Sequence, residues 1–273
     1  MPNGIEYSRI KNLVIQQKLH TICVSGNCPN KGECWSAGTA TFMILGEKCT
    51  RDCKFCQVTT LRPDPIDYDE PARVAMTIKS MNLKHCVITS VARDELADGG
   101  AGIWALTIRT IKKINPGITM EVLIPDFRRG TKALDLIINE RPEITSHNIE
   151  TVERLNPVIR SMTRYEHSIE LLKYVSSHKI RTKSGLMLGI GETREEVLTA
   201  MDDLLRAGVS VLTLGQYLRP TLQHMPVTEY IHPDVFKEYK VIAFQKGFIH
   251  VESGPNVRSS YHSERHISTN LTG

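Results

Sequence analysis

Long apolar runs, aromatic residues and clusters of basic residues are all scarce in this chain of 273 residues. No segment approaches the roughly 20 apolar residues that a membrane-spanning helix requires, so we expect no membrane partner. Aromatic residues make up 6% of the chain, and the Lys and Arg behind its net charge of +4 are spread along it, which argues against a nucleic acid partner. The first 13 residues show neither an apolar signal region nor the Arg- and Ser-rich composition of a transit peptide. These features together predict a cytoplasmic protein.

Motifs of several common enzyme classes are missing as well. The ten histidines form no H-x3-H or H-E-x-x-H pattern, so a histidine-based metal site has no support. The chain has neither a P-loop nor a nucleophile elbow. The glycines between Gly185 and Glu192 do not form a dinucleotide-binding fingerprint.

Cysteine is also scarce, but it is concentrated. Six of the seven cysteines lie between Cys23 and Cys56, in two groups of three. Thiols persist in a reducing compartment, so clustered cysteines indicate metal or redox chemistry more than disulfides. We name the first group, Cys23, Cys28 and Cys34, the upstream trio, and the second group, Cys49, Cys53 and Cys56, the downstream trio.

Short β-type runs alternate with helical patterns from about residue 40 onward. Helical spacing of apolar residues marks 71–82 and 197–205, and a further helix is expected at about 232–246. Helical crossovers between strands imply a parallel sheet, and continuous apolar strands imply burial on both of its faces. The predicted strands are 41–46, 85–90, 120–125, 143–148, 184–189 and 209–215, with a short one at 248–253 after the last helix.

Polar segments follow all six main strands at the point where each strand ends. In barrel enzymes the carboxyl ends of the strands carry the active site. Six units rather than eight therefore predict an α/β fold with a partial (βα)6 TIM-like barrel. We expect three segments: an N-terminal extension with the upstream trio (1–40), the barrel (41–252), and a C-terminal tail that folds over the barrel mouth (253–273).

Two kinds of metal site can use a cysteine trio. Structural zinc takes four ligands, but zinc ribbons usually show two C-x2-C pairs and only Cys53–Cys56 has this spacing. In the second interpretation each trio holds three corners of an iron–sulfur cube, which leaves one iron open to another ligand. The residues favour the cubes and leave zinc as an alternative.

The downstream trio has the spacing C-x3-C-x2-C, with Phe55 just before the last cysteine. This pattern resembles the signature of the radical S-adenosylmethionine enzymes. The resemblance implies a 4Fe-4S cluster on Cys49, Cys53 and Cys56, with S-adenosylmethionine bound to its open iron and Phe55 beside the adenine. Such enzymes cleave S-adenosylmethionine to a 5′-deoxyadenosyl radical, which removes hydrogen from unactivated carbon.

The upstream C-x4-C-x5-C spacing points to one family within this class of enzymes. Together with the segments CPNKGECW, GTATFMILG, HNIETV, GLMLGIGET, GQYLRPT and RSSY, it is similar to the lipoyl synthases over residues 21–262. The resemblance implies a second 4Fe-4S cluster on Cys23, Cys28 and Cys34 that serves as the sulfur source. The implied reaction inserts two sulfur atoms, at carbons 6 and 8 of an octanoyl chain that is amide-linked to a lysine of a carrier protein.

The resemblance also implies roles for residues outside the trios. One serine of the RSSY motif would be the fourth ligand of the upstream cluster, and we predict Ser260 rather than Ser259. Arg258 would steady that segment or the substrate, although a polar tail without such roles is the alternative. The residues expected to contact S-adenosylmethionine or substrate are Asn148, Glu150, Lys183, Glu192 and Arg219.

Structural roles compete with these assignments. Asn148 and Glu150 can instead cap a helix beginning near Thr151. A tight turn explains the glycines before Glu192, and a surface salt bridge is the alternative for Arg219. Cys86 lies in an apolar run and is expected to be a small core residue.

The implied partners follow from the implied chemistry. They are an octanoylated lipoyl-carrier protein or domain, a low-potential electron donor of the flavodoxin or ferredoxin type, and an iron–sulfur carrier that rebuilds the consumed cluster. A different sulfur-inserting radical enzyme is one alternative, against which the upstream trio and RSSY argue. A two-cluster electron carrier would be smaller and would close each cluster with four cysteines. The last alternative is a zinc-stabilised binding module.

Overall fold

The computed structural model describes residues 5–36, 39–160 and 162–267. The chain forms two compact units. The N-terminal unit comprises the described residues up to Arg51 together with Gln57–Glu143, and the C-terminal unit comprises Asp52–Cys56 and the described residues from Ile144 onward. The downstream trio therefore contributes Cys49 to one unit and Cys53 and Cys56 to the other.

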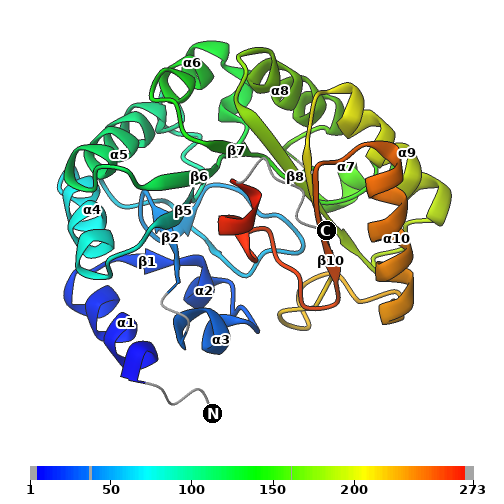
Figure 1. The fold of residues 1–273 in the computed structure, drawn as a ribbon, viewed down its shortest axis with the longest axis horizontal. Helices are drawn as coiled ribbons and strands as arrows, with labels where there is room; N and C mark the ends of the chain where they lie inside the picture. The colour runs from blue at the N-terminus through cyan, green and yellow to red at the C-terminus, as the bar shows by residue number, and fades with distance from the viewer. Residues whose placement is uncertain (1–4, 37–38, 161, 268–273) are drawn as a thin grey trace. The chain divides into compact units, whose positions relative to one another are not determined.

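The N-terminal unit contains strands in the order β1-β2-β5-β6. Strands β2, β5 and β6 are parallel, and the short β1 pairs antiparallel with β2. Figure 1 shows α4, α5 and α6 on one face of these strands. The strand bounds are β1 (His20–Thr21), β2 (Thr41–Ile44), β5 (His85–Ser90) and β6 (Thr119–Leu123), and β3 (Lys48–Cys49) and β4 (Thr59–Thr60) form a separate pair. The helices are α1 (Ile5–Gln16), α2 (Ile22–Ser25), α3 (Lys31–Ser36), α4 (Glu70–Ser80), α5 (Ala101–Ile114), η1 (Phe127–Arg129) and α6 (Thr131–Asn139).

The C-terminal unit contains the parallel strands β7-β8-β9-β10. Helices α8, α9 and α10 cover one face, and the short η3 lies on the other (Figure 1). The strands are β7 (Ile144–Ser146), β8 (Arg181–Leu188), β9 (Val211–Gln216) and β10 (His250–Gly254). The helices are η2 (Glu153–Leu155), α7 (Asn156–Ile159), α8 (Tyr165–Ser177), α9 (Arg194–Arg206), α10 (Pro233–Lys246) and η3 (Ser263–His266).

Local sequence explains where the main helices begin and which face they bury. Thr193 and Glu196 form a reciprocal capping box at the start of α9. Pro71 occupies the first turn of α4, where a missing N–H costs nothing. The apolar face of α9 joins a core that includes β8 and β9, with Val197, Met201, Leu204, Leu186, Leu212 and Leu214 all buried.

The α/β class with mostly parallel strands is confirmed. All six main strands and the short last one are present, and α4 and α10 lie within a residue or two of the predicted helices. Strand β8 begins at Arg181, three residues earlier than predicted, because the polar run before Gly185 is buried in the sheet. The helix expected near Thr151 begins two residues later, as a 3-10 turn at Glu153 that continues directly into α7.

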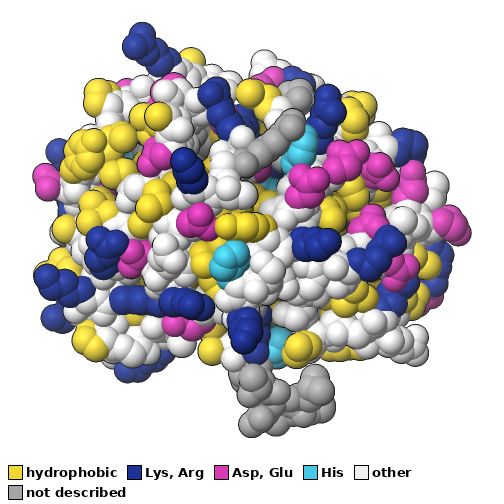
Figure 2. All heavy atoms as spheres, turned by 90° about the horizontal axis from the view of Figure 1, so that it is seen from above, with side chains coloured by type: hydrophobic (Ala, Val, Ile, Leu, Met, Phe, Trp, Pro, Cys, Tyr) yellow, Lys and Arg dark blue, Asp and Glu magenta, His cyan; other side chains and the backbone are white. Residues whose placement is uncertain are grey.

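The surface carries charges of both signs. On the face drawn in Figure 2, Lys and Arg side chains lie among Asp, Glu and apolar side chains. Among the described residues, no helix is both long and apolar enough to cross a membrane.

Candidate functional site

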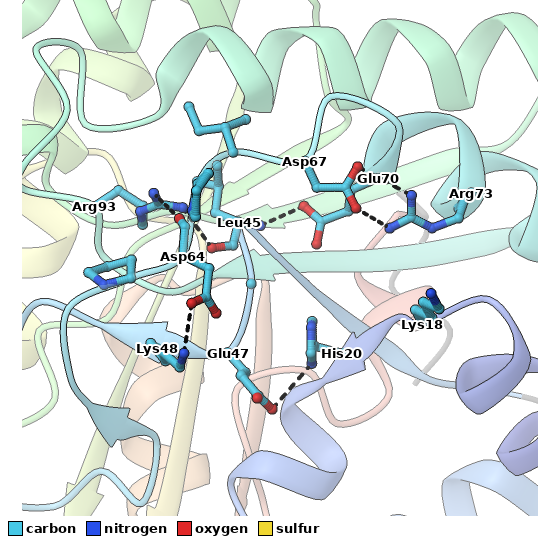
Figure 3. Close-up of a pocket in the computed structure, with 14 residues that line it drawn as sticks. Lys18, His20, Leu45, Glu47, Lys48, Asp64, Asp67, Glu70, Arg73 and Arg93 are labelled. Atoms are coloured by element: carbon cyan, nitrogen blue, oxygen red, sulfur yellow. Dashed lines mark hydrogen bonds and ion pairs between the residues drawn. The ribbon is translucent and has the colours of Figure 1, made fainter.

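The turn that leads from β2 toward Cys49 is held from both sides by buried charges. Leu45 and Gly46 adopt left-handed backbone angles, with φ of 68° and 90°. The Leu45 N–H donates to Glu70 Oε2 at 2.7 Å, and the Arg93 guanidinium donates to the Leu45 carbonyl at 3.0 Å (Figure 3). A non-glycine residue in this conformation needs support from its surroundings, and these two side chains provide it.

Glu70 and Arg93 line a cavity of about 260 Å³ beside this turn. Burial raises the pKa of Glu70, while hydrogen bonds from the N–H groups of Leu45 and Gly46 oppose the rise. Other charged groups around the cavity pair with one another, such as Lys48 with Asp64 at 2.8 Å. The charged residues that line the cavity therefore support the backbone of the turn.

Cys49 is the only downstream cysteine in the N-terminal unit, and its sulfur accepts two backbone hydrogen bonds. The N–H groups of Arg51 and Ala92 each lie 3.4 Å from Cys49 Sγ. Such N–H···S bonds stabilise a thiolate and tune any cluster that it binds. Cys49 is thus prepared as a ligand by its backbone surroundings.

The segment with Cys53 and Cys56 is anchored within the C-terminal unit. The Lys54 N–H donates to the Ile159 carbonyl at 3.0 Å, and the Lys54 carbonyl accepts from the Met225 N–H at 3.1 Å. His224 Nε2 lies 3.0 Å from the Cys56 carbonyl. The loops after β7 and β9 therefore hold this segment.

Arg219 shapes the loop that supplies these anchors. Its guanidinium donates to the carbonyl of His224 at 2.9 Å and also to that of Leu222. The hydrogen bonds of the Arg219 guanidinium are thus made within its own loop, and they support the backbone at His224. His224 and Met225 were not among the predicted site residues, because a hydrogen bond to a backbone carbonyl has no recognisable sequence pattern.

Phe55 packs against a small apolar cluster at the carboxyl side of the C-terminal unit. The buried members of the cluster are Ile159, Ile190 and Tyr217. Phe55 itself is partly exposed, so the cluster does not cover its side chain completely. This arrangement suits an aromatic side chain that packs against a flat ligand.

The upstream trio lies wholly within the N-terminal unit. Cys23 is buried on α2, whose start is capped by the Thr21 hydroxyl, and Cys34 lies on α3. Cys28 lies between these helices, and its N–H donates to the Cys23 carbonyl at 3.2 Å. Two short helices and one turn thus carry the three thiols.

The three upstream thiols influence one another electrostatically. Burial raises the pKa of Cys23, and the charge of Cys28 adds to the rise. Burial also raises the pKa of Cys34 to about 11, with further contributions from the charges of Cys23 and Cys28. A bound cation would offset the repulsion between the three thiolates. The upstream trio therefore fits a metal cluster.

The thiols do not surround one point. Among the residues that the structure describes, no three His, Cys, Asp or Glu side chains are placed to bind a single metal ion together. In an iron–sulfur cube each thiolate binds a different iron, so convergence on one point is not needed.

Asn148 lies just after β7 and has an unusual hydrogen-bond pattern. Its side-chain nitrogen donates to Ser259 Oγ at 2.5 Å. Its side-chain oxygen is buried and has no hydrogen-bond partner among the described residues. A bound molecule with a donor group would satisfy this oxygen, so Asn148 fits a contact with S-adenosylmethionine. Neither Asn148 nor Glu150 caps the helical segment that begins at Glu153, because Val152 occupies its N-cap and no side chain caps it.

Gly185 in β8 provides space beside Asn148. A Cβ atom at this position would lie 2.3 Å from Thr213 Oγ1 and 3.2 Å from Asn148 Oδ1. Glycine is therefore required for the close approach of β8 and β9 here. The Glu150 backbone continues the pairing, since its N–H donates to the Gly185 carbonyl at 3.1 Å. Burial raises the pKa of Glu150, opposed by Arg160 and by a hydrogen bond from Asn148.

Glu192 supports the turn that follows β8. Its carboxylate accepts the N–H groups of Gly189 at 2.6 Å and Ile190 at 3.0 Å. The turn needs Gly189 because φ there is 93°. Glu192 therefore fixes the backbone that leads away from the strand end.

Lys183 lies away from the carboxyl ends of the strands. It occupies the amino half of β8, is fully buried, and has its Nζ 3.4 Å from His266 Nδ1. Arg181, at the start of β8, donates to the His266 carbonyl. These contacts hold the end of the described tail against β8, which gives Lys183 a structural role.

The tail folds back onto the strands of the C-terminal unit. Ser259 is held by Asn148, and the Arg258 guanidinium donates to the carbonyls of Val257 and Pro255 at 2.6 and 3.3 Å. The Val257 carbonyl would lie 2.2 Å from a Cβ atom at Gly215, so the tail packs closely on β9. Ser260, the next residue, is partly exposed.

Comparison with known proteins gives the class of this fold and site. The family model of the radical SAM superfamily matches residues 43–204. Among solved structures, methylornithine synthase aligns with a TM-score of 0.58 at 10% identity, over 99% of this chain and 89% of that one. HydG, a maturase of the FeFe-hydrogenase, aligns with a TM-score of 0.62 at 10% identity, over 96% and 74%. The chain is a radical SAM enzyme by fold and by its C-x3-C-x2-C loop.

Closer relatives define the family within that class. Lipoyl synthase, mitochondrial, of Nematostella vectensis is 54% identical over 268 residues, which cover 98% of this chain and 92% of the relative. Lipoyl synthase of Flavobacterium psychrophilum is 53% identical with the same coverage, and that of Phocaeicola vulgatus is 55% identical over 96% and 92%. The chain belongs to the lipoyl synthase family. Members of this family are enzymes that insert sulfur to form lipoyl groups, as the sequence predicted.

Proposed function

We propose that this chain inserts two sulfur atoms, at carbons 6 and 8 of an octanoyl chain amide-linked to a lysine of a carrier protein. The observation that carries the proposal is the pair of separately built cysteine trios in a chain of this family. One trio lies on a loop that donates N–H···S bonds, and the other is a partly buried group of mutually repelling thiols. Two sites of such different character suit two clusters with different tasks.

Bound 4Fe-4S clusters and S-adenosylmethionine supply the radical and the sulfur, and the chain's residues position them. Cys49, Cys53 and Cys56 hold the first cluster, and Phe55 offers its ring to the adenine. The free side-chain oxygen of Asn148 accepts a hydrogen bond from S-adenosylmethionine. Glu150 lies beside it on the same segment, while Glu192 and Arg219 act indirectly by fixing turns.

Cys23, Cys28 and Cys34 hold the second cluster, with Ser260 as its fourth ligand. The hydrogen bond from Asn148 to Ser259 supports this assignment, because it fixes the backbone position immediately before Ser260. Arg258 is folded onto the carbonyls of its own turn, which steadies the segment. A serine oxygen is a harder and weaker ligand for iron than a thiolate, which suits a cluster that is taken apart.

The chemistry requires three partners. An octanoylated lipoyl-carrier protein or domain is the substrate, a flavodoxin- or ferredoxin-type protein supplies electrons, and an iron–sulfur carrier restores the consumed cluster. The proposed location is the cytoplasm, although the name of the Nematostella relative places that protein in mitochondria.

Metal analysis tests the proposal. Protein reconstituted without oxygen should hold about eight iron and eight sulfide per chain, which corresponds to two cubes. Incubation with S-adenosylmethionine, a strong reductant and an octanoyl-lysine peptide should give a lipoyl product detectable by mass spectrometry. One or two zinc ions per chain without sulfide would disprove the proposal.

A further inference from the structure

Arg51 occupies the centre of the loop that carries the downstream trio. It follows Cys49 by two residues and precedes Cys53 by two. Its side chain is only 8% exposed. A fully charged guanidinium in this position requires partners, and the partners show what it does.

Two carboxylates from different loops bind the Arg51 guanidinium. Its Nε and one terminal nitrogen donate to the two oxygens of Asp94, at 2.8 and 2.6 Å. The same terminal nitrogen lies 2.6 Å from Asp126 Oδ1. Asp94 follows β5 and Asp126 follows β6, so one side chain ties the loop after β2 to the loops after the next two strands. A bidentate pair of this kind fixes orientation as well as distance.

Ion pairing opposes the effect of burial on Asp94 and Arg51. Burial would raise the pKa of Asp94, but hydrogen bonds from Arg51 and Thr50 and the charges of Arg51 and Arg128 lower it overall. Burial would lower the pKa of Arg51, but the hydrogen bond to Asp94 and the charge of Asp126 raise it. Two carboxylates pair with one buried guanidinium, so the three groups together carry a net negative charge near the loop. The largely exposed Arg128, whose Nε lies 3.5 Å from Asp94 Oδ1, partly offsets it.

The network connects directly to the sulfur of Cys49. The two N–H groups that donate to Cys49 Sγ belong to Arg51 itself and to Ala92, which precedes Asp94 by two residues. Thr50 links these two segments, because its hydroxyl donates to Asp94 at 2.7 Å and its N–H donates to the Ala92 carbonyl at 3.2 Å. Both donors to the sulfur therefore lie on segments that the ion pairs hold together.

We propose that Arg51 is a positioning residue that sets the reduction potential of the downstream cluster through the two N–H···S bonds to Cys49. Hydrogen bonds to cluster sulfurs stabilise the reduced, more negative state and so raise the potential. Loosening the network should weaken these bonds. This inference rests on the proposed function, because it assumes that Cys49 is a cluster ligand.

Two variants should shift the potential in opposite directions. Arg51→Lys keeps the positive charge but cannot bind three carboxylate oxygens in a fixed plane, so the N–H···S bonds loosen and the potential becomes more negative. Asp126→Asn keeps both Arg51–Asp94 bonds and removes one negative charge near the cluster, so the potential becomes more positive. Loss of such supporting contacts commonly costs about 10- to 100-fold in activity, and we expect Arg51→Lys to slow S-adenosylmethionine cleavage by that factor.

The control is the same substitution at a more exposed bidentate pair in the same unit. Arg73 binds Asp67 through two nitrogens at 2.7 and 3.3 Å, and Arg73→Lys should leave both the potential and the cleavage rate unchanged. The readouts are a redox titration of the reconstituted two-cluster protein, followed by the electron paramagnetic resonance signal that changes on adding S-adenosylmethionine, and the melting temperature.

Each outcome is decisive. Opposite shifts in Arg51→Lys and Asp126→Asn, with none in Arg73→Lys, would support the proposal. Lower melting temperatures with an unchanged potential would show that the network only stabilises the fold. If Arg51→Lys does not fold, Asp94→Asn takes its place: it removes the same charge as Asp126→Asn but also breaks the bidentate pair, so its potential should lie below that of Asp126→Asn, and equal potentials would overturn the proposal. Wild-type protein without an S-adenosylmethionine-dependent signal would instead contradict the proposed function itself.

Discussion

The two cysteine trios differ in how much of their geometry exists before a metal binds. Around Cys49, two N–H groups already donate to the sulfur, and buried side chains hold the backbone on both sides of it. In the upstream trio, burial and repulsion between the thiols disfavour the thiolate form of Cys23 and Cys34. The downstream loop is therefore built to keep one geometry, whereas the upstream site needs a metal to stabilise its charged form.

This contrast matches the two proposed tasks. A cluster that transfers an electron in every cycle benefits from rigid ligands with a fixed potential. A cluster that gives up its sulfur must come apart, and a site with weaker support assists that step.

Removing one cysteine from each trio should separate the two tasks completely. Cys53→Ala removes a ligand of the cofactor cluster and should abolish cleavage of S-adenosylmethionine. Cys28→Ala should retain cleavage to 5′-deoxyadenosine but form no lipoyl product. Chromatography of the nucleoside and mass spectrometry of the peptide measure both steps. Sulfur insertion by Cys28→Ala would show that the upstream trio is not the sulfur site.

Substitutions in the RSSY motif should affect only the upstream cluster. Ser260→Ala should lower lipoyl formation by about 10- to 100-fold, because an iron loses its fourth ligand, while cleavage of S-adenosylmethionine persists. Ser260→Cys should give a more stable cluster and slower sulfur insertion, because a thiolate binds iron more strongly. Ser259→Ala is the comparison variant, and because it removes the hydrogen bond from Asn148, both variants are compared by the lipoyl product formed per S-adenosylmethionine cleaved. A larger loss for Ser259→Ala than for Ser260→Ala would reverse the assignment of the ligand.

Stability without metal should depend more on the downstream support than on the Cys28 thiol of the upstream trio. Asp94→Ala leaves the buried Arg51 with one carboxylate and should reduce the free energy of unfolding of cluster-free protein by about 3–5 kcal/mol. Cys28→Ala should change it little, because that thiol is only partly buried. Chemical denaturation of the two variants measures the difference. Equal losses would mean that both regions are equally organised before metal binding.

The smallest effect concerns the pH at which Cys34 reacts. Its pKa rises from an ordinary value near 9 to about 11, so cluster-free protein should be alkylated slowly at Cys34 below pH 9 and faster up to about pH 11. A folded-state pKa above the unfolded one means that this thiol stabilises the fold below pH 9, and that the contribution is lost as the pH rises through 11. Peptide mapping after timed alkylation gives the profile. An inflection near 9 would show that neither burial nor the other thiols affect Cys34.

The sequence was sufficient to predict the strands and the thiols but not the side chains that support them. Strand β5 matches its predicted bounds because its apolar run is continuous and both of its faces are buried. The cysteine spacing is local along the chain and therefore visible in the sequence. The pairing of Arg51 with Asp94 and Asp126 joins residues more than 40 positions apart, and no local pattern indicates which carboxylate an arginine will meet.

The residues expected to contact S-adenosylmethionine show the same limit. Lys183 was expected to contact S-adenosylmethionine because the family resemblance implies it, and in the structure it lies in the amino half of β8. Asn148 was expected to bind a ligand or cap a helix, yet its nitrogen holds Ser259, 111 residues away in the sequence. The roles of Ser260 and Arg258 and the three-segment division of the chain remain predictions.

The central claim is that the upstream trio holds the sulfur that enters the product. Protein reconstituted with sulfide of a heavy sulfur isotope can be incubated without oxygen with S-adenosylmethionine, a strong reductant and an octanoyl-lysine peptide, with no free sulfide present. Mass spectrometry of the peptide then reports the origin of each sulfur atom. We predict that both sulfur atoms of the lipoyl product carry the heavy isotope in the wild-type chain, and that Cys28→Ala gives no such product. A lipoyl product with light sulfur, or a labelled product from Cys28→Ala, would contradict the claim.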